Sequence, residues 1–363
     1  MMLKIVDLVK KFSGFTLGPL NLKISDNEIL VMIGATGNGK TTILNLIAGL
    51  IKPDSGSIYL DEIDITNHPI ESRNIGYSFQ RPNLFPFLTV YQNIIFGIKK
   101  KDRINKKKQI ETLVNSLGIS HLVNRNIQGL SGGEMQKISL ARTLVVDPKI
   151  LLMDEPLSSL DNFTKRKLRI EIRQVIKNLM ISCIYVTHFE EDVYSLADSV
   201  AVLKNGCIKE YEKLGTLLSY NSLSLNSSSY EVENKYNNYL EGIVVESVNG
   251  ITKIKIHSFF IELIGNYRIG TLVGLILKPE DIILSLDMVK TSARNVIKTN
   301  ILNIGKDDYP TIGVVNIYLL VNGIRLISRI TDESLKYLDL KKGDYVFAIF
   351  KSTSPQIIRQ VEV

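Results

Sequence analysis

A glycine-rich segment followed by a lysine and two threonines is the strongest chemical feature of this 363-residue chain. Residues 34–42 read GATGNGKTT and fit G-x-x-x-x-G-K-[ST], the pattern of a phosphate-binding loop. The glycines let backbone N–H groups turn toward phosphate oxygens, and the lysine adds a point charge. The threonine hydroxyl after the lysine suits Mg²⁺. The expected phosphate contacts are Gly34, Thr36, Gly37, Asn38, Gly39, Lys40, Thr41 and Thr42.

An acidic pair follows an apolar run further along the chain. Residues 150–153 read ILLM, which is typical of a buried parallel strand, and Asp154 and Glu155 come directly after it. Ligands bind at the carboxyl ends of such strands, so we expect Asp154 to hold Mg²⁺ or a water on it. Glu155 is then placed to orient or deprotonate an attacking water. Beside the phosphate loop, this pair predicts a phosphate-loop NTPase.

Strands alternating with helices must position these residues. Short apolar runs predict strands over 3–8, 21–25, 28–33, 150–153, 183–187 and 200–203, and a helical pattern covers 40–50. This alternation predicts an α/β domain with a largely parallel sheet. The phosphate loop joins strand 28–33 to helix 40–50, so the positive end of the helix faces the phosphates.

Residues 130–134, LSGGE, resemble the signature sequence of the ATP-binding-cassette (ABC) family. Other elements of that family stand in the expected order along the chain. Gln80 resembles its glutamine loop, residues 158–161 (SSLD) resemble its D-loop, and His188 resembles its switch histidine. Phe12 stands where the family places an aromatic that stacks on adenine, with Phe15 as the other candidate. The resemblance covers about residues 3–215.

The resemblance implies an ATPase that works as a head-to-tail dimer, in which the signature of one chain faces the ATP held by the other. It implies catalytic roles for Lys40, Gln80, Glu155 and His188. It also implies ATP contacts for Phe12, Ser131, Gly132, Gly133 and Asp161, and Mg²⁺ ligation for Thr41, Gln80 and Asp154. Residues 81–97 resemble the segment by which importer cassettes grip the cytoplasmic helix of a permease.

The chain changes character after the cassette. Residues 216–238 are rich in Ser and Asn and predict a linker. Strand patterns then follow over 241–248, 252–257, 272–277, 299–304, 312–320, 324–330, 345–350 and 357–361, which predicts an all-β domain. Gly270 and Gly343 each precede a valine by three positions and a lysine by eight. Two small barrels of similar design would explain this repeat, and so would chance.

Short motifs in the second region indicate an anion site. Residues 277–282, LKPEDI, resemble an element of importer cassettes with a β-barrel accessory domain. Ser292 to Asn295 resemble the entry of the molybdate-binding barrel, and Lys351-Ser352 its Lys-Ser pair. Hydroxyls and cations are what a tetrahedral dianion needs, so Ser292, Arg294, Lys351 and Ser352 are candidate oxyanion ligands. The alternative is a domain that only dimerises.

The expected architecture is an α/β phosphate-loop ABC ATPase domain over 1–215, a linker over 216–238 and an all-β domain over 239–363. The first domain should combine a parallel-sheet core, a helical subdomain and an N-terminal antiparallel part. The second should be an OB-like regulatory domain of the TOBE/Mop type, with its Mop-like part at about 290–356.

Composition bounds the remaining choices. Apolar residues make up 45% and charged residues 22%, which excludes a disordered chain, and the longest apolar stretches are too short to span a membrane. The net charge of +7 is too dispersed to indicate nucleic acid. The basic run 99–108 is interpreted as a solvated helix end or loop.

The whole chain resembles the ATPase subunit of a molybdate or tungstate importer, with ATP and Mg²⁺ as cofactors and possible feedback by the oxyanion. The expected partners are a second copy of the chain, a membrane permease and, indirectly, a solute-binding protein, at the cytoplasmic face of the cell membrane. One alternative is the same machine for sulfate, iron, a polyamine or a sugar. The other is an ABC ATPase without a transport role.

Overall fold

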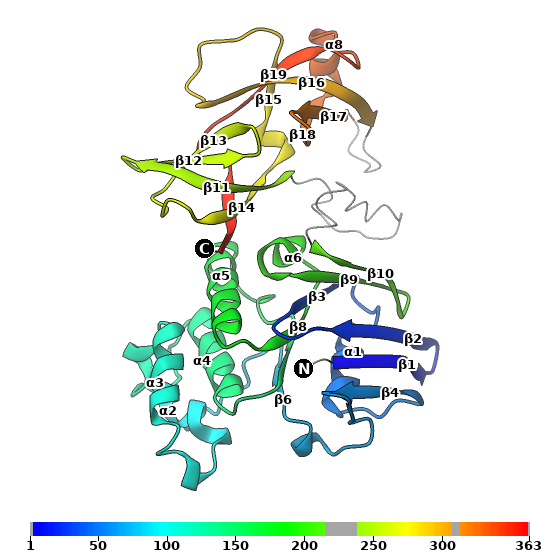
Figure 1. Ribbon diagram of the computed structural model, residues 1–363, viewed down its shortest axis with the longest axis vertical. Helices are drawn as coiled ribbons and strands as arrows, with labels where there is room; N and C mark the ends of the chain where they lie inside the picture. The colour runs from blue at the N-terminus through cyan, green and yellow to red at the C-terminus, as the bar shows by residue number, and fades with distance from the viewer. Residues whose placement is uncertain (1–2, 215–237, 307–312, 362–363) are drawn as a thin grey trace. The chain divides into compact units, whose positions relative to one another are not determined.

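The computed structural model describes residues 3–214, 238–306 and 313–361. They form two compact units, residues 3–214 and residues 238–361 with the gap at 307–312, and each is described by itself (Figure 1). The expected linker over 216–238 therefore lies outside the described residues apart from its last position. No helix in the described part of the chain is long and apolar enough to cross a membrane.

A six-stranded sheet forms the centre of the first unit. Its order is β10-β9-β3-β8-β7-β6, and all neighbouring strands are parallel except β9 and β10. The strands are β3 (Ile29–Ile33), β6 (Ile75–Ser78), β7 (Ile150–Asp154), β8 (Ser182–Thr187), β9 (Ser199–Lys204) and β10 (Cys207–Lys213). Every residue of β3, β7 and β8 is buried, as their continuous apolar runs predict.

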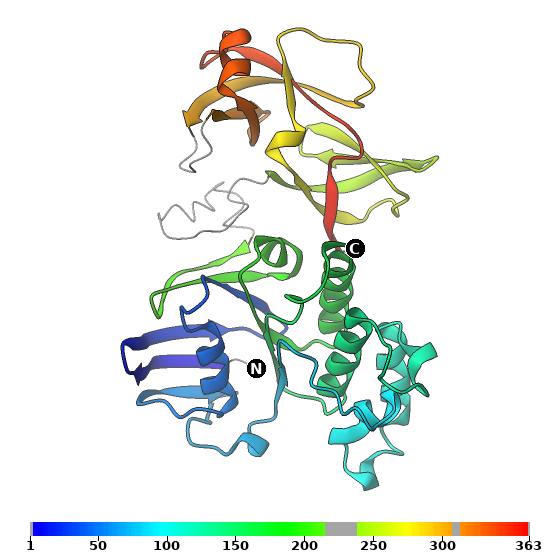
Figure 2. The same cartoon turned by 180° about the vertical axis from the view of Figure 1, so that it is seen from behind.

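A four-stranded antiparallel sheet packs onto the same core. Its order is β2-β1-β4-β5, with β1 (Leu3–Phe12), β2 (Phe15–Ile24), β4 (Ser55–Leu60) and β5 (Ile63–Asp64). Helix α1 (Lys40–Ala48) lies beside it in both views, and its apolar residues share one cluster with alternate residues of the parallel strands (Figures 1 and 2). The helix ends two residues earlier than predicted, because Gly49 takes a left-handed conformation and caps it.

Helices make up the remainder of the first unit. They are α2 (Val90–Ile94), α3 (Lys107–Ser116), α4 (Gly132–Leu144), α5 (Asn162–Asn178) and α6 (Glu190–Leu196), with short 3₁₀ turns η1 (Ile70–Ser72), η2 (Ile95–Gly97), η3 (Lys100–Asp102) and η4 (Ser120–Leu122). Helices α2, α3 and α4 lie together at one side of the unit (Figure 1). The expected α/β fold, with its parallel sheet, antiparallel part and helical subdomain, is confirmed.

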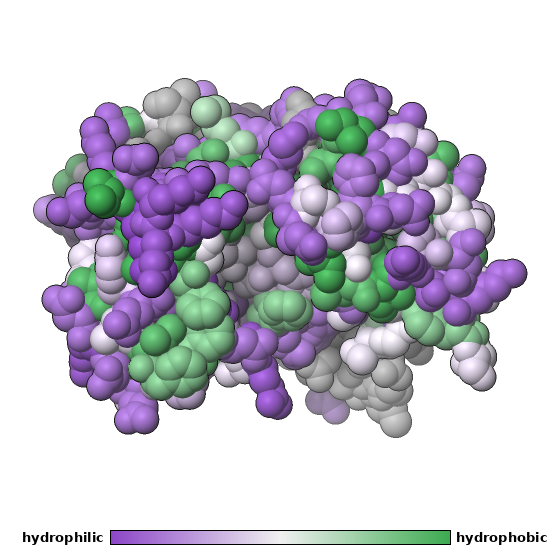
Figure 3. Space-filling model, turned by 90° about the horizontal axis from the view of Figure 1, so that it is seen from below, coloured by the Kyte–Doolittle hydropathy of each residue, from purple (hydrophilic) through white to green (hydrophobic). Residues whose placement is uncertain are grey.

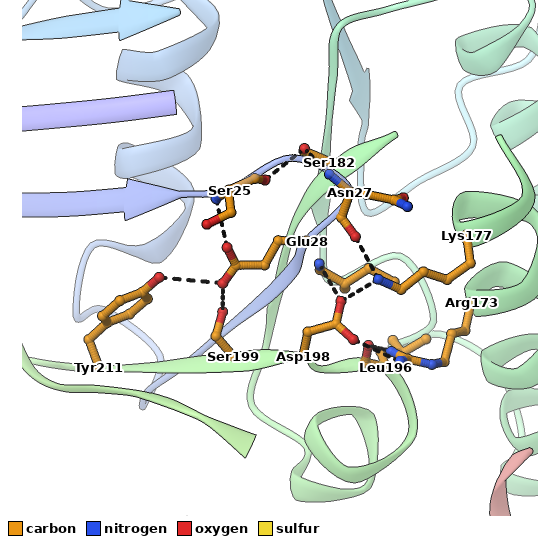
Figure 4. A network of polar contacts seen from close by, with 11 residues as sticks. Ser25, Asn27, Glu28, Arg173, Lys177, Ser182, Leu196, Asp198, Ser199 and Tyr211 are labelled. Carbon is orange, nitrogen blue, oxygen red and sulfur yellow. Dashed lines mark hydrogen bonds and ion pairs between the residues drawn. The ribbon is translucent and has the colours of Figure 1, made fainter. Parts of the chain in front are cut away.

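A polar network holds the strand ends opposite the phosphate loop (Figure 4). The Asp198 carboxylate accepts hydrogen bonds from Arg173 at 2.8 Å, from Lys177 at 2.6 Å and from the backbone N–H of Ile29 at 2.8 Å. Glu28 accepts from the hydroxyls of Ser199 and Tyr211. These contacts tie β3, β9, β10 and α5 together, so charged groups replace apolar packing at this edge.

Two five-stranded antiparallel sheets build the second unit. One has the order β13-β12-β11-β14-β20 and the other β18-β17-β16-β19-β15. The strands are β11 (Asn238–Val248), β12 (Ile251–Ile256), β13 (Phe259–Ile264), β14 (Leu272–Leu277), β15 (Ile283–Ser285), β16 (Asn295–Lys306), β17 (Val314–Val321), β18 (Ile324–Thr331), β19 (Tyr345–Phe350) and β20 (Gln356–Val361), with η5 (Pro279–Asp281) and α8 (Asp332–Tyr337) between them. The all-β expectation is confirmed, and β13, β15 and α8 are elements that the sequence patterns did not reveal.

The two sheets repeat one topology. Each sheet contains four consecutive strands, β11–β14 in one and β16–β19 in the other, and these pair in the order third-second-first-fourth. The fifth place in each sheet is filled by the strand that follows the four strands of the other half. Thus β15 follows β14 in the chain but pairs with β19, and β20 follows β19 in the chain but pairs with β14. Apolar residues of both sheets form one cluster. The repeat is therefore a duplication within one core, and not two separate barrels.

Two buried asparagines mark the same duplication. Asn238 opens β11 and Asn295 opens β16. The Asn238 amide bonds the backbone N–H and C=O of Ile327 in β18, at 2.6 and 2.9 Å. The Asn295 amide bonds the same groups of Glu262 in β13, at 2.7 and 2.8 Å. Each half thus binds the third strand of the other half, which locks the two sheets together.

Candidate functional site

The phosphate loop connects β3 to α1, as predicted. Gly37 and Gly39 have φ of 87° and 96°, a backbone region that side chains disfavour. A Cβ on Gly34 would lie 2.4 Å from the carbonyl oxygen of Leu203, so this position also requires glycine. The consequence is a loop whose backbone N–H groups open toward the N-terminus of α1.

Asn38 has a structural role that the loop pattern did not predict. Its amide donates to the Leu203 carbonyl at 3.2 Å and accepts from the Asn205 N–H at 3.2 Å. The side chain therefore fastens the loop to the end of β9. The asparagine at this variable position of the loop pattern is the only sequence signal of this role, and it does not indicate which residues it bonds.

Lys40 lies at the bottom of the site with its ammonium group enclosed by oxygens. It donates to the carbonyls of Gly34 at 2.7 Å and Ala35 at 3.1 Å, and lies 3.7 Å from the Glu155 carboxylate. Burial lowers the pKa of Lys40, while the charges of Glu155 and Asp154 oppose that shift. A polyphosphate would add further negative charge beside this buried cation and so favour its charged form.

Thr41 and Asp154 meet across the loop, as the predicted Mg²⁺ site requires. The Thr41 hydroxyl donates to the Asp154 carboxylate at 2.9 Å. Burial raises the pKa of Asp154, and the Thr41 hydrogen bond only partly opposes this. The hydroxyl and the carboxylate are the oxygen ligands that Mg²⁺ prefers, and a cation would stabilise the charged form of the desolvated carboxylate. The pair therefore fits Mg²⁺.

Glu155 joins the lysine to the predicted switch histidine. One carboxylate oxygen faces Lys40, and the other lies 3.1 Å from His188 Nδ1. Glu155 has a φ of 43°, which is unusual for a residue with a side chain, and its N–H donates to the Val186 carbonyl. The turn after β7 thus aims the carboxylate toward the loop, beside the end of β8.

A pocket of 320 Å³ opens at this point, lined by Phe12, Phe15, Thr36, Gly37, Gly39, Lys40, Thr41, Thr42 and Glu155. Phe12 and Phe15 stack with ring centroids 6.5 Å apart, and the Phe12 side chain is 43% exposed. Both aromatic candidates therefore border the pocket, and either ring could cover a flat base.

The signature residues lie where α4 begins. Ser131 is the N-cap of α4, and its N–H and hydroxyl both donate to the Glu134 carboxylate, at 2.8 and 2.7 Å. A Cβ on Gly132 would lie 2.8 Å from the Leu160 side chain, so close packing of the D-loop explains glycine there. Among the described residues, those that line the pocket include none of the signature.

Two further predicted residues contact the D-loop region. The Gln80 amide donates to the Ser158 hydroxyl at 3.2 Å, and not to Thr41 or Asp154. Asp161 is the N-cap of α5 and accepts from the Thr164 N–H at 3.0 Å. In the structure Gln80 thus lies near the D-loop but does not bond to Thr41 or Asp154, the pair predicted to bind Mg²⁺.

Arg142 of the signature helix holds the segment after Gln80, which sequence reasoning missed. Its guanidinium donates to the carbonyls of Pro82 and Asn83, each at 3.0 Å, and stacks 5.4 Å from the Phe85 ring centroid. Asn93 bonds the same segment from α2, accepting from the Phe85 N–H at 2.8 Å. The available sequence signal was a charged residue, Arg142, directly after the apolar pair Leu140-Ala141.

The candidate oxyanion residues come together in part. Asn295 pairs with Phe350, so Arg294 and Lys351 stand one residue beyond the last pair of β16 and β19. Arg294 already faces the Glu262 carboxylate at 3.3 Å. The Ser352 carbonyl accepts from the Ile264 N–H at 3.1 Å, which places Ser352 beside β13. Ser292 lies exposed in the preceding loop.

Comparison with known proteins agrees with this geometry. The family model of the ABC transporter matches residues 17–158, and that of the TOBE domain matches residues 291–355. The chain belongs to the ABC transporter family, and its first unit is an ATP-binding ATPase of that family.

The chain is similar to a molybdate/tungstate import ATP-binding protein of Pyrococcus abyssi, with 34% identity over 98% of this chain and 100% of that protein. It is also similar to a spermidine/putrescine import ATP-binding protein of Fusobacterium nucleatum, with 35% identity over 79% of this chain and 77% of that protein. Among solved structures, cbiO1 from Clostridium perfringens, part of an ABC transporter complex, matches 62% of this chain and 94% of its own at 29% identity and a TM-score of 0.55.

Proposed function

We propose that this chain is the ATP-hydrolysing subunit of an importer for molybdate or tungstate. The observation that carries the solute is that the molybdate/tungstate relative matches both units and its own whole length. The polyamine relative leaves about a fifth of the chain unmatched. We further propose that the cassettes work as a head-to-tail dimer under a membrane permease fed by a solute-binding protein, at the cytoplasmic face, with no role for nucleic acid.

The side chains of the site support in-line attack of water on the γ-phosphorus of ATP. Lys40 holds the β- and γ-phosphates, and Glu155 orients the water and takes its proton as the new P–O bond forms. The bond to the β–γ bridging oxygen breaks, and ADP leaves with that oxygen. Mg²⁺, held by Thr41 and Asp154, would neutralise phosphate charge. His188 keeps Glu155 in place.

Dimer formation is proposed from the position of the signature. Ser131 caps α4, and Gly132 and Gly133 begin it outside the pocket of their own chain, so the N–H groups of the two glycines remain available to a γ-phosphate held by a second copy. We expect Glu155→Gln to bind ATP and to accumulate as a dimer, because the glutamine cannot take the proton. Size-exclusion chromatography with light scattering, with and without ATP, measures this. A monomer at saturating ATP would contradict the proposed dimer.

The second unit is proposed to sense the transported oxyanion. Arg294 and Lys351 at neighbouring strand ends supply two cations, and Ser292 and Ser352 supply hydroxyls. Isothermal titration of the full chain with molybdate, tungstate and sulfate tests this. Binding of the first two that is lost in Lys351→Ala supports a sensor. Binding of none would reduce the unit to a dimerisation module, with the ATPase unaffected.

Uptake itself tests the solute. The chain and its permease in proteoliposomes should accumulate molybdate or tungstate only when ATP is present on the side of the membrane that carries the cassette. Accumulation of spermidine or putrescine instead would favour the second candidate.

A further inference from the structure

Residues 99–108, KKKDRINKKK, carry most of the net charge of the chain. They contain seven basic residues and one acidic residue, a net charge of +6, while the whole chain has a net charge of +7. The remaining sequence is therefore close to neutral. The structure places this stretch in η3 and at the start of α3, on the helical part of the first unit.

Five lysines of this stretch are exposed, and we call them the lysine surface: Lys99, Lys100, Lys101, Lys107 and Lys108. Within the part of the chain that the structure describes, no carboxylate pairs with any of them. Lys106 differs, because it bonds Asp147 at 2.8 Å and the Val145 carbonyl at 2.9 Å. Lys106 therefore anchors the segment, while the lysine surface keeps its charge available.

A large apolar side chain stands among these lysines. Ile104 is 85% exposed, more than most large apolar residues of the chain, and Phe96 just before the stretch is 56% exposed. The view from below shows hydrophilic surface beside a hydrophobic patch over the helical part, at the left (Figure 3). Cations around an exposed apolar residue match a membrane interface, where the charges meet lipid phosphates and the apolar group enters the acyl boundary.

We propose that the lysine surface binds the phosphate headgroups of anionic lipids, with Ile104 inserted between them. The proposal rests on the proposed function in one respect, because a permease partner would bring the cassette to the membrane. Residues 81–97, proposed to contact that permease, run directly into the stretch. A membrane is favoured over nucleic acid because the stretch contains no aromatic ring for base stacking and presents an aliphatic side chain instead.

The expected strength follows from the number of charges. Each basic residue near an anionic surface strengthens binding about fivefold, so removing three should weaken it about a hundredfold. The attraction must also fall with salt, because the screening length drops from about 10 Å at about 0.1 M to about 3 Å at about 1 M.

The test is co-sedimentation of the full chain with vesicles of phosphatidylcholine alone or mixed with phosphatidylglycerol. The parent should bind only the mixed vesicles, and Lys100→Gln/Lys101→Gln/Lys107→Gln should bind about a hundredfold more weakly. Ile104→Ser should weaken binding with the charge unchanged. The matched control removes three exposed lysines of the second unit, Lys290, Lys336 and Lys342, and should bind like the parent.

Each contrary result overturns the proposal. Equal loss in the control triple would mean that only total charge matters. Binding to pure phosphatidylcholine would mean that lipid phosphate charge is not recognised, and displacement by duplex DNA below the lipid concentration would favour nucleic acid. ATP hydrolysis is measured on every variant, because these lysines are outside the nucleotide site. A parent chain that hydrolyses ATP but does not bind the mixed vesicles therefore refutes this proposal alone, whereas a parent chain without hydrolysis refutes the proposed ATPase.

Discussion

Arg142 is expected to connect the nucleotide site to the segment proposed to contact the permease. It belongs to α4, which begins at the signature, and it holds the carbonyls of Pro82 and Asn83 just after Gln80. Replacing it with alanine removes two hydrogen bonds from a charged donor and one cation–π contact with Phe85. The segment should then open locally while the rest of the unit stays folded.

The magnitude follows from these three contacts. A half-exposed hydrogen bond from a charged group contributes about 1.5 kcal/mol, and an exposed cation–π contact about 0.5 kcal/mol. Arg142→Ala should therefore lower the local free energy of opening by about 3.5 kcal/mol, which raises the opening equilibrium about 400-fold. Arg142→Lys should raise the same opening equilibrium about tenfold, because one ammonium cannot bond two carbonyls in the planar arrangement of a guanidinium.

Hydrogen exchange of the full chain measures this opening. The Phe85 N–H, which donates to Asn93, is the reporter, and its exchange should accelerate about 400-fold in Arg142→Ala. Lys137→Ala is the control, because Lys137 lies on α4 like Arg142 but forms its ion pair with Glu171 of α5, away from the segment. Unchanged exchange at Phe85 in Arg142→Ala, or equal acceleration in the control, would mean that Arg142 does not hold the segment.

Two other perturbations test the charges of the two units. Burial opposes ionisation of Asp198, but Arg173 and the Lys177 hydrogen bond outweigh it and hold the pKa of Asp198 below its usual value. Its stabilising effect is therefore complete above about pH 4 and is lost as pH falls through the lowered pKa, so Asp198→Asn should cost about 3 kcal/mol at about pH 7 and little in acid. Urea denaturation across pH checks this, and an equal cost in acid would contradict it. In the second unit, Glu262→Gln should free Arg294 and strengthen oxyanion binding about threefold, the strength of an exposed ion pair. Titration of the full chain measures it, and weaker binding would mean that Glu262 helps to form the site.

The nucleotide site was largely predictable because its motifs are local. The loop 34–42 specifies its own backbone through glycines and places Lys40 and Thr41 by helix geometry. Asp154 follows a strand whose apolar run identifies it as parallel and buried, so it could be placed at the carboxyl edge of the sheet, where the loop with Thr41 also lies. The contact of His188 with Glu155 did not, because it depends on the turn after β7.

The second unit was predictable in class but not in arrangement. Turn residues and alternation identified most strands, yet β15 has only three residues and β13 follows β12 after a short turn. The three residues of β15 are too few to form a pattern, and the six of β13 begin with three consecutive apolar residues that obscure the alternation. The repeat of Gly270 and Gly343 was a true trace of duplication, but the exchange of the fifth strands could not be seen in it.

The sequence by itself determined the chemistry: a phosphate loop, an acidic strand end and a signature in family order, each set by residues close along the chain. The tertiary structure alone decided what holds these parts to one another. Arg142 reaches Pro82, Asn38 reaches Leu203, and Asn295 reaches Glu262. Each of these contacts joins residues from separate elements. A buried polar side chain must form a hydrogen bond, but the residues next to it in the sequence do not specify which distant backbone group will be its partner.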